Sequence, residues 1–288
     1  MAEILDRRLA GRSVAQRGAI LAVWIGIAIV ALNLFAAIFG RFLAPHSAGE
    51  FVTAEPFAAP SGGLIFGSDY LGRDVYSRLL EGAGLTIGLS IFSTVLGYAI
   101  GVPIGFIAGV VGGWVDGALS RIAELFMSVP PILLALLLTT AFGSSFSVLI
   151  IIVGLIHAPR VVRIARAIAA NITVLEFVEV ARARGEHTWS IMRREIWPNA
   201  LRPLAAEFGI RLTFSVLLVS SMSFIGIGLP PPTSDWGSMV RENLGGLYYG
   251  SYAVLVPALA IGTLAVGINM IVDWLGASSG RDISEGFI

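Results

Sequence analysis

The side chains that carry most enzyme chemistry are absent or scattered in this chain. There is no cysteine, which excludes disulfides, thiolate metal sites and thiol nucleophiles. All 19 basic residues are arginine, so a Schiff-base lysine and the lysine of a Walker A phosphate loop are missing too. His46, His157 and His187 lie too far apart in sequence to suggest a zinc cluster. We therefore predict no catalytic residue, no metal site, no bound cofactor and no nucleic-acid partner.

The polar motif Gly67–Asp74 has the small residues and acids that ion-binding loops use, in the order Gly-Ser-Asp-Tyr-Leu-Gly-Arg-Asp. It lacks a phosphate-loop lysine, and its acids do not follow the spacing of an EF-hand. We interpret it as a turn that leads into an amphipathic elbow helix on a surface. Direct contact with a partner or substrate is the alternative.

A second polar segment, Glu179–Pro203, is rich in arginine and lies between two strongly apolar stretches. Arginine at the centre of a bilayer costs a few kcal/mol, so the segment should project from a membrane towards a soluble partner. Thr173 and Glu176 fit a capping box that starts a short helix, and Gly185 would end it with positive φ. A second short helix would run from Thr188 to Arg194, before a proline. An apolar contact face would comprise Phe177, Val180, Ala181 and Trp189.

The alternative interpretation of Glu179–Pro203 is a solvated loop that only joins two spans. Composition supports the membrane setting: 56% of residues are hydrophobic, 13% are charged and the mean hydropathy is +0.84. An all-α, polytopic integral membrane protein is expected. Its six spans each approach or exceed the ~20 residues that cross a bilayer, and a proline pair should kink the third. The spans are Ala19–Phe39, Leu85–Val110, Ala118–Phe142, Phe146–Ala167, Leu204–Gly228 and Tyr252–Gly276.

The distribution of arginine predicts the orientation. Four arginines precede the first span, nine lie between His157 and Arg211, and only one lies in the loop 229–251. The domain plan is a cytoplasmic tail (1–18), a first transmembrane helix (19–40) that is retained rather than cleaved as a signal peptide, and an extracytoplasmic loop and elbow (41–84). A five-helix core follows (85–276), with a cytoplasmic coupling loop at 168–203 and a cytoplasmic C-terminal tail at 277–288.

Polar residues inside the spans have two interpretations each. Glu207 and Arg211, one helical turn apart, are expected to pair near the inner end of their span, with a place in an ion pathway as the alternative. Asn269 and Asp273 are expected to form interhelical hydrogen bonds. The small polar residues of the fifth predicted span either pack against neighbouring helices or line a path; they are Ser215, Ser220, Ser221 and Ser223.

Four sequence blocks resemble one family. Glu179-Val180-Ala181, Gly185 and Ile196-Trp197-Pro198 resemble the E-A-A-x3-G…I-x-x-P loop of binding-protein-dependent ABC importer permeases, with Val180 in place of alanine and Trp197 in place of a frequent leucine. Gly67–Leu79 is similar to the G-T-D-x-x-G-R-D-x-x-S-R block of the dipeptide, oligopeptide and nickel permeases. Ser223–Gly228 with the following Pro-Pro-Thr and Trp-Gly resembles another block, and Ser128–Pro131 matches S-x-P-P. The resemblance covers about residues 18 to 282.

This resemblance implies the type I ABC importer permease fold, with six transmembrane helices, in the bacterial inner membrane and with both termini cytoplasmic. It implies a heterodimer with a paired permease, two cytoplasmic ATPase subunits that bind ATP-Mg, and an extracytoplasmic solute-binding protein. The chain would be the second permease of the pair, with the shorter outer loop. The residues that couple the permease to the ATPases would be Glu179, Ala181, Gly185, Ile196 and Pro198. The outer loop would contain Gly67, Asp69, Gly72, Arg73 and Asp74. The candidate path-lining residues are Ser128, Ser215, Ser220 and Ser223.

The expected function is therefore ATP-driven import of di- or oligopeptides, without ATP hydrolysis by this chain. Import of nickel chelates or other small solutes is the nearest alternative. An ion-coupled secondary transporter would need ionisable residues near the bilayer midplane, whereas the acids of this chain lie near the ends of the predicted spans. A membrane enzyme would need a converging acid, base or metal constellation, which the sequence does not show.

Overall fold

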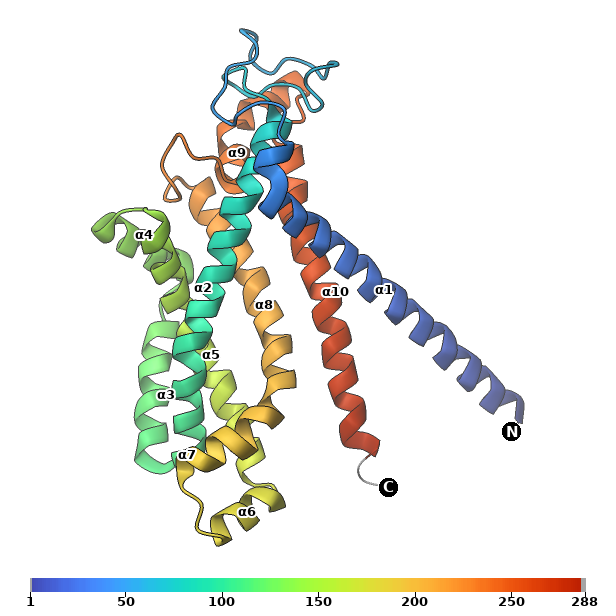
Figure 1. The fold of residues 1–288 in the computed structure, drawn as a ribbon, viewed down its shortest axis with the longest axis vertical. Coiled ribbons are helices and arrows are strands. Elements are labelled where there is room, and N and C mark those ends of the chain that lie inside the picture. The colour runs from blue at the N-terminus through green and yellow to red at the C-terminus, as the bar shows by residue number, and fades with distance from the viewer. Residues whose placement is uncertain (1, 286–288) are drawn as a thin grey trace.

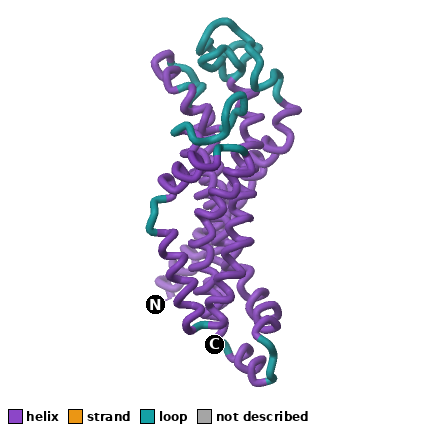
Figure 2. Tube along the Cα trace, turned by 90° about the vertical axis from the view of Figure 1, so that its left-hand side faces the viewer, coloured by secondary structure: helices purple, strands orange, loops and turns teal. Residues whose placement is uncertain are grey.

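Long apolar helices dominate the computed structural model, which describes residues 2–285 and the side chains of residues 20–276 (Figures 1 and 2). Residue 1 and residues 286–288, at the ends of the predicted tails 1–18 and 277–288, lie outside the described residues. The helices are α1 (Ala2–Leu43), α2 (Val75–Val111), α3 (Gly113–Met127), α4 (Pro131–Phe142), α5 (Phe146–Thr173), α6 (Glu176–Ala183), α7 (Thr188–Ile191), α8 (Trp197–Phe224), α9 (Trp236–Glu242) and α10 (Leu255–Glu285).

Five helices are long and apolar enough to cross a membrane, and the third predicted span is broken rather than continuous. Within 118–142 the chain forms α3 and α4, which meet at 82°. Pro130 is extended, with φ −56° and ψ 132°. A residue that precedes a proline, as Pro130 precedes Pro131, is pushed out of the helical region, so α3 ends at Met127 and a new helix begins. The pair counts as a sixth span only if its two halves cross together.

α2 and α5 pack backbone to backbone along a glycine stripe. Gly97, Gly101, Gly105 and Gly109 follow one another at intervals of four on α2 and therefore share one helix face. A Cβ atom at Gly105 would lie 2.5 Å from the carbonyl oxygen of Val162 on α5. Such stripes of small residues let membrane helices approach closely.

The two ends of the bundle differ in structure. The loop between α1 and α2 gathers with α9 at one end, and α6 and α7 project at the other (Figure 1). The N-terminal end of α1 and the C-terminal end of α10 both lie towards the α6 end. The turn Gly67–Asp74 leads into a helix, but this helix is α2 itself and not a separate elbow, because α2 starts ten residues before the predicted span at Leu85. Asp74 caps it, accepting hydrogen bonds from the amides of Tyr76 and Ser77.

The α6 end corrects two local predictions. Thr173 is not an N-cap: it is the last residue of α5, and its hydroxyl donates to the carbonyl oxygen of Ala169 at 2.7 Å. α6 begins after Leu175 without any side-chain cap. The second short helix does not stop before Pro198 but passes through a π-helical turn, Met192–Ile196, into α8. Proline is accepted in the first turn of α8 because amides there lack partners in any case.

Candidate functional site

The turn between α6 and α7 is closed by a glycine. Gly185 has φ +80°, the left-handed conformation expected from the sequence. Its amide donates to the carbonyl oxygen of Arg182 at 2.9 Å, and the amide of Glu186 donates to that of Ala181 at 3.2 Å. These bonds satisfy carbonyl groups that the end of α6 leaves free. No atom lies within 4 Å of the position that a Cβ of residue 185 would take.

One face of α6 is anchored to the bundle. Val178 and Ala181 are fully buried, as is Ile196, and they share an apolar cluster with Val102 and Phe106 of α2. Ala181 therefore points inwards, and its predicted place in an exposed contact face is wrong. Burial of small and branched side chains at this point holds α6 in a defined position relative to α2 and α5.

The opposite face of α6 and the start of α7 are unusually apolar for an exposed surface. Val180 is 53% exposed and Trp189 is 71% exposed. We call this region the coupling surface; its exposed members are Phe177, Glu179, Val180, Arg182, Arg184 and Trp189. Exposed large apolar side chains ringed by charges are typical of protein interaction sites.

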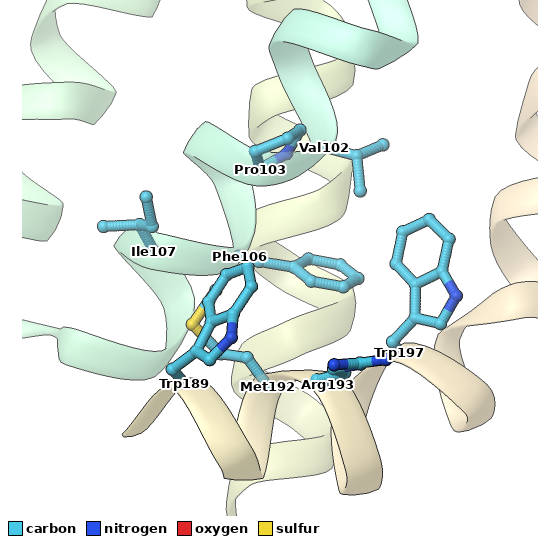
Figure 3. Close-up of a pocket in the computed structure, with 8 residues that line it drawn as sticks. All are labelled: Val102, Pro103, Phe106, Ile107, Trp189, Met192, Arg193 and Trp197. Carbon is cyan, nitrogen blue, oxygen red and sulfur yellow. The ribbon is translucent and has the colours of Figure 1, made fainter. Parts of the chain in front are cut away.

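A cavity of about 360 Å³ lies between α2 and the segment that runs from Trp189 to Trp197 (Figure 3). It is lined by Val102, Pro103, Phe106 and Ile107 on one side and by Trp189, Met192, Arg193 and Trp197 on the other. The rings of Phe106 and Trp197 meet edge to face with their centroids 5.9 Å apart. Trp197, which departs from the family motif, thus has a packing role against α2.

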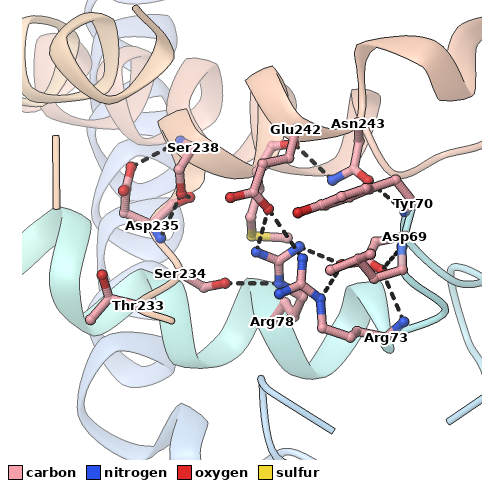
Figure 4. Close-up of polar contacts among 12 residues, drawn as sticks. Asp69, Tyr70, Arg73, Arg78, Thr233, Ser234, Asp235, Ser238, Glu242 and Asn243 are labelled. Carbon is pink, nitrogen blue, oxygen red and sulfur yellow. Dashed lines mark hydrogen bonds and ion pairs between the residues drawn. The ribbon is translucent and has the colours of Figure 1, made fainter. Parts of the chain in front are cut away.

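At the other end of the bundle, two arginines and two acids form a buried network (Figure 4). One carboxylate oxygen of Asp69 accepts from Arg73 at 2.7 Å and from Arg78 at 2.5 Å. Glu242 of α9 accepts from the same two arginines at 3.2 and 2.9 Å. Arg78 also donates to the hydroxyl of Ser234 at 2.8 Å. No sequence pattern indicates that Glu242 contacts residues more than 160 positions away.

This network shows that the block Gly67–Leu79 and the segment from Ser234 to Glu242 fold against each other. The indole of Trp236 donates to the carbonyl oxygen of Leu79 at 3.0 Å, and its backbone amide donates to the hydroxyl of Thr86 at 3.0 Å. Asp69, Arg73 and Asp74 are buried. Gly67 and Gly72 both have φ +78°. The side chains of the three charged residues therefore lie inside the loop. This favours the interpretation of Gly67–Asp74 as a structural turn over direct contact with a partner.

Asp235 begins α9 and has a perturbed acidity. It accepts the amide of Ser238 at 3.1 Å in a capping box. Burial raises the pKa of its carboxyl group above the ordinary value, and the hydrogen bonds from Ser238 oppose that rise. The local structure therefore favours the protonated form more than water would.

The four serines predicted to line a path lie in different settings. The hydroxyl of Ser215 is buried and 2.7 Å from that of Thr94 on α2, so it joins two helices. Ser223 is buried beneath the chain at Gly228 and Gly237. Both side chains pack between elements of this chain, and their place along a path stays a prediction. Ser220 borders a cavity of about 270 Å³, and Ser128 is exposed and donates to the carbonyl oxygen of Leu125.

The polar pairs expected within the spans are present in part. Arg211 donates to Glu207 at 2.5 Å, as predicted from their spacing. Thr213 donates to Asn269 at 3.3 Å, which connects α8 with α10. Arg211 lies 14 residues after Trp197 and 13 before Phe224, the bounds of α8, which begins before the predicted span at Leu204. It borders a polar cavity with His157, Arg160 and Arg163. The sequence pattern used the two arginines only for the orientation, and His157 only in the argument against a zinc cluster.

Comparison with known proteins agrees with this architecture. Residues 101–284 match the family described as "Binding-protein-dependent transport system inner membrane component". The glutathione transport system permease protein GsiD of Pectobacterium atrosepticum is 30% identical over 247 residues, which is 85% of this chain and 82% of the relative. The protein of the same name from Shigella flexneri serotype 5b is 34% identical with the same coverage.

A solved structure shows the same fold. A chain of the MetNI methionine ABC transporter in an inward-facing conformation superposes with a TM-score of 0.59 at 20% identity, covering 68% of this chain and 93% of that chain. The helical architecture, the membrane-spanning helices and the family match agree with one another. This chain therefore belongs to the family of inner membrane components of binding-protein-dependent transport systems and is a multi-pass permease subunit of an ABC importer.

Proposed function

We propose that this chain is one permease of a heterodimeric pair that imports di- or oligopeptides. Two cytoplasmic ATPase subunits would bind the coupling surface, and an extracytoplasmic binding protein would deliver cargo to the end built by the Asp69–Glu242 network. The observation that carries this proposal is the coupling surface itself. Val178 and Ala181 fix the opposite face of α6 to the bundle, while Val180 and Trp189 of the coupling surface remain exposed for a partner.

Relatives support the peptide cargo. The similar permeases from Pectobacterium and Shigella are named for transport of glutathione, which is a tripeptide. In this mechanism ATP binding closes the two ATPases, and the coupling surface passes that movement to α2 and α5. This chain then contributes the path and the coupling but not the hydrolysis.

Reconstitution tests the proposal directly. Proteoliposomes that contain both permeases and both ATPases should accumulate a labelled peptide only when ATP and the binding protein are present, and vanadate should stop the uptake. Liposomes without the ATPases are the matched control and should not concentrate the peptide. Concentrative uptake by the permeases alone, driven by a proton or sodium gradient, would instead establish an ion-coupled transporter.

We also propose that both termini and the coupling surface face the cytoplasm. The chain lacks cysteine, so single cysteines report position without background from this subunit. A Tyr248→Cys variant, at a residue 93% exposed near α9, should react with an impermeant maleimide in intact spheroplasts. A Thr188→Cys variant, exposed at the start of α7, should react only after permeabilisation. The reverse pattern would contradict this orientation.

A further inference from the structure

A polar cavity of about 540 Å³ lies between α5 and α8. Its lining includes His157, Arg160 and Arg163 from α5 and Arg211, Phe214 and Ser221 from α8. Arg160 lies 14 residues after Phe146 and 13 before Thr173, so it is halfway along its helix, as Arg211 is along α8. The volume falls within the roughly 300–1,000 Å³ of small-molecule sites.

The polar groups of this cavity are incompletely paired. His157 is 3% exposed, and neither ring nitrogen has a hydrogen-bond partner in the described part of the chain. Arg160 donates to the carbonyl oxygen of Ile156 at 3.1 Å. Among residues 20–276, neither Arg160 nor Arg163 forms an ion pair; Arg211 pairs with Glu207. Of the three guanidinium groups, only that of Arg211 contacts a carboxylate among these residues.

An excess of positive charge inside membrane helices is costly unless a ligand, a partner or water offsets it. Burying a polar ring without a hydrogen bond also costs free energy. Arg211 is further held in place by stacking over the ring of Phe214, with its guanidinium carbon 5.1 Å from the ring centroid. These features describe a site prepared for an anion.

We propose that this cavity binds a carboxylate of the transported molecule during its passage. The inference rests on the proposed function, because it assigns the cargo class of that importer: small peptides with a free carboxylate, favoured over amidated or cationic ones. Guanidinium groups bind carboxylates through paired, charge-assisted hydrogen bonds. A neutral imidazole can add one donor.

A lipid phosphate would be recognised by the same charge-assisted hydrogen bonds. Competition distinguishes a cargo carboxylate from this source: S-methylglutathione should slow labelling of the cavity, and trialanine amide should not.

Charge-selective labelling tests the inference in the purified, complete transporter. In the Ser221→Cys variant, a negatively charged methanethiosulfonate should react about 10-fold faster than a positively charged one, relative to their rates with a free thiol, because a cleft of one charge concentrates the opposite charge. The preference should disappear when Arg160→Gln and Arg163→Gln are added. S-methylglutathione, which carries two carboxylates, should slow the labelling, and trialanine amide should not.

Equilibrium dialysis of labelled S-methylglutathione gives a second measurement on the same assembly. Arg163→Gln should weaken binding about 10-fold, the loss expected for one charge-assisted hydrogen bond. Arg121→Gln, which removes an exposed arginine of α3 outside the cavity, is the matched control and should change neither readout. Equal labelling by both reagents, together with binding unchanged by Arg163→Gln or absent altogether, overturns the inference even when ATP-driven uptake is normal. Arginine-dependent binding without ATP-driven uptake overturns the proposed function and supports the cavity.

Discussion

Replacing Arg78 with alanine should destabilise the protein by about 3–5 kcal/mol, the usual cost of removing one member of a buried ion pair. Arg78 has 1% of its side chain exposed and contacts Asp69, Glu242 and Ser234 together. Its loss leaves the fully buried carboxylate of Asp69 with Arg73 as its remaining ion-pair partner. Thermal unfolding of the purified protein in detergent, followed by tryptophan fluorescence, measures the change.

Arg241 provides the control for this prediction. It is exposed on α9 next to Glu242, and among the side chains of residues 20–276 it forms no ion pair. Arg241→Ala should therefore change stability by no more than about 0.5 kcal/mol. Adding Asp69→Asn to Arg78→Ala should cost less than the sum of the two single changes, because the buried charge is removed with its partner. An Arg78→Ala protein as stable as the wild type would show that the network does not hold the outer end together.

Replacing Gly185 with valine should reduce peptide uptake at least about 10-fold while leaving the protein in the membrane. A left-handed conformation costs an L-residue roughly 1–2 kcal/mol, and branching at Cβ makes it worse. No atom lies close enough to clash with the added side chain, so the expected effect comes from the backbone alone. The turn should open, the coupling surface should shift, and ATP hydrolysis should continue without transport.

The backbone explanation predicts a graded series. Gly185→Asn should keep most of the uptake, because asparagine visits the left-handed region readily. Glu179→Ala should have a smaller effect than Gly185→Val, since Glu179 is exposed and leaves the turn intact. Uptake and ATPase activity are measured together in proteoliposomes. Equal losses in the asparagine and valine variants would mean that side-chain volume at the partner interface, not φ, is what matters.

Much of this fold could be predicted from hydropathy and a few turn residues. Length and apolar composition identify five spanning helices because the bilayer imposes one length on all of them. Gly185 was predictable as a left-handed residue because helix ends select glycine there. The pairing of Glu207 with Arg211 was predictable because residues four apart meet on one helix face.

The remaining features depend on contacts between distant segments. The Thr173 capping box failed because α5 runs on through that residue, and tertiary packing outweighs a local motif. The proline pair was expected to kink a helix, yet the extended Pro130 divides it into two. Arg73 and Arg78 bridge Asp69 to Glu242, 173 positions away, which no local spacing encodes. Arg160 and Arg163 could have been noticed within the predicted span 146–167, because arginine is rare there.

The glycine stripe of α2 has a mechanical consequence. α2 begins at Val75, beside the Asp69–Glu242 network, and Val102 and Phe106 near its other end pack in the cluster that holds α6. Its 37 residues extend over about 55 Å at 1.5 Å per residue. Because its backbone lies directly against α5, α2 has little room to slide along that helix. The two helices would therefore tilt together. A tilt of about 10° around the middle would displace each tip by about 5 Å, given that length. Force applied at α6 would therefore displace the opposite end of α2, beside the Asp69–Glu242 network.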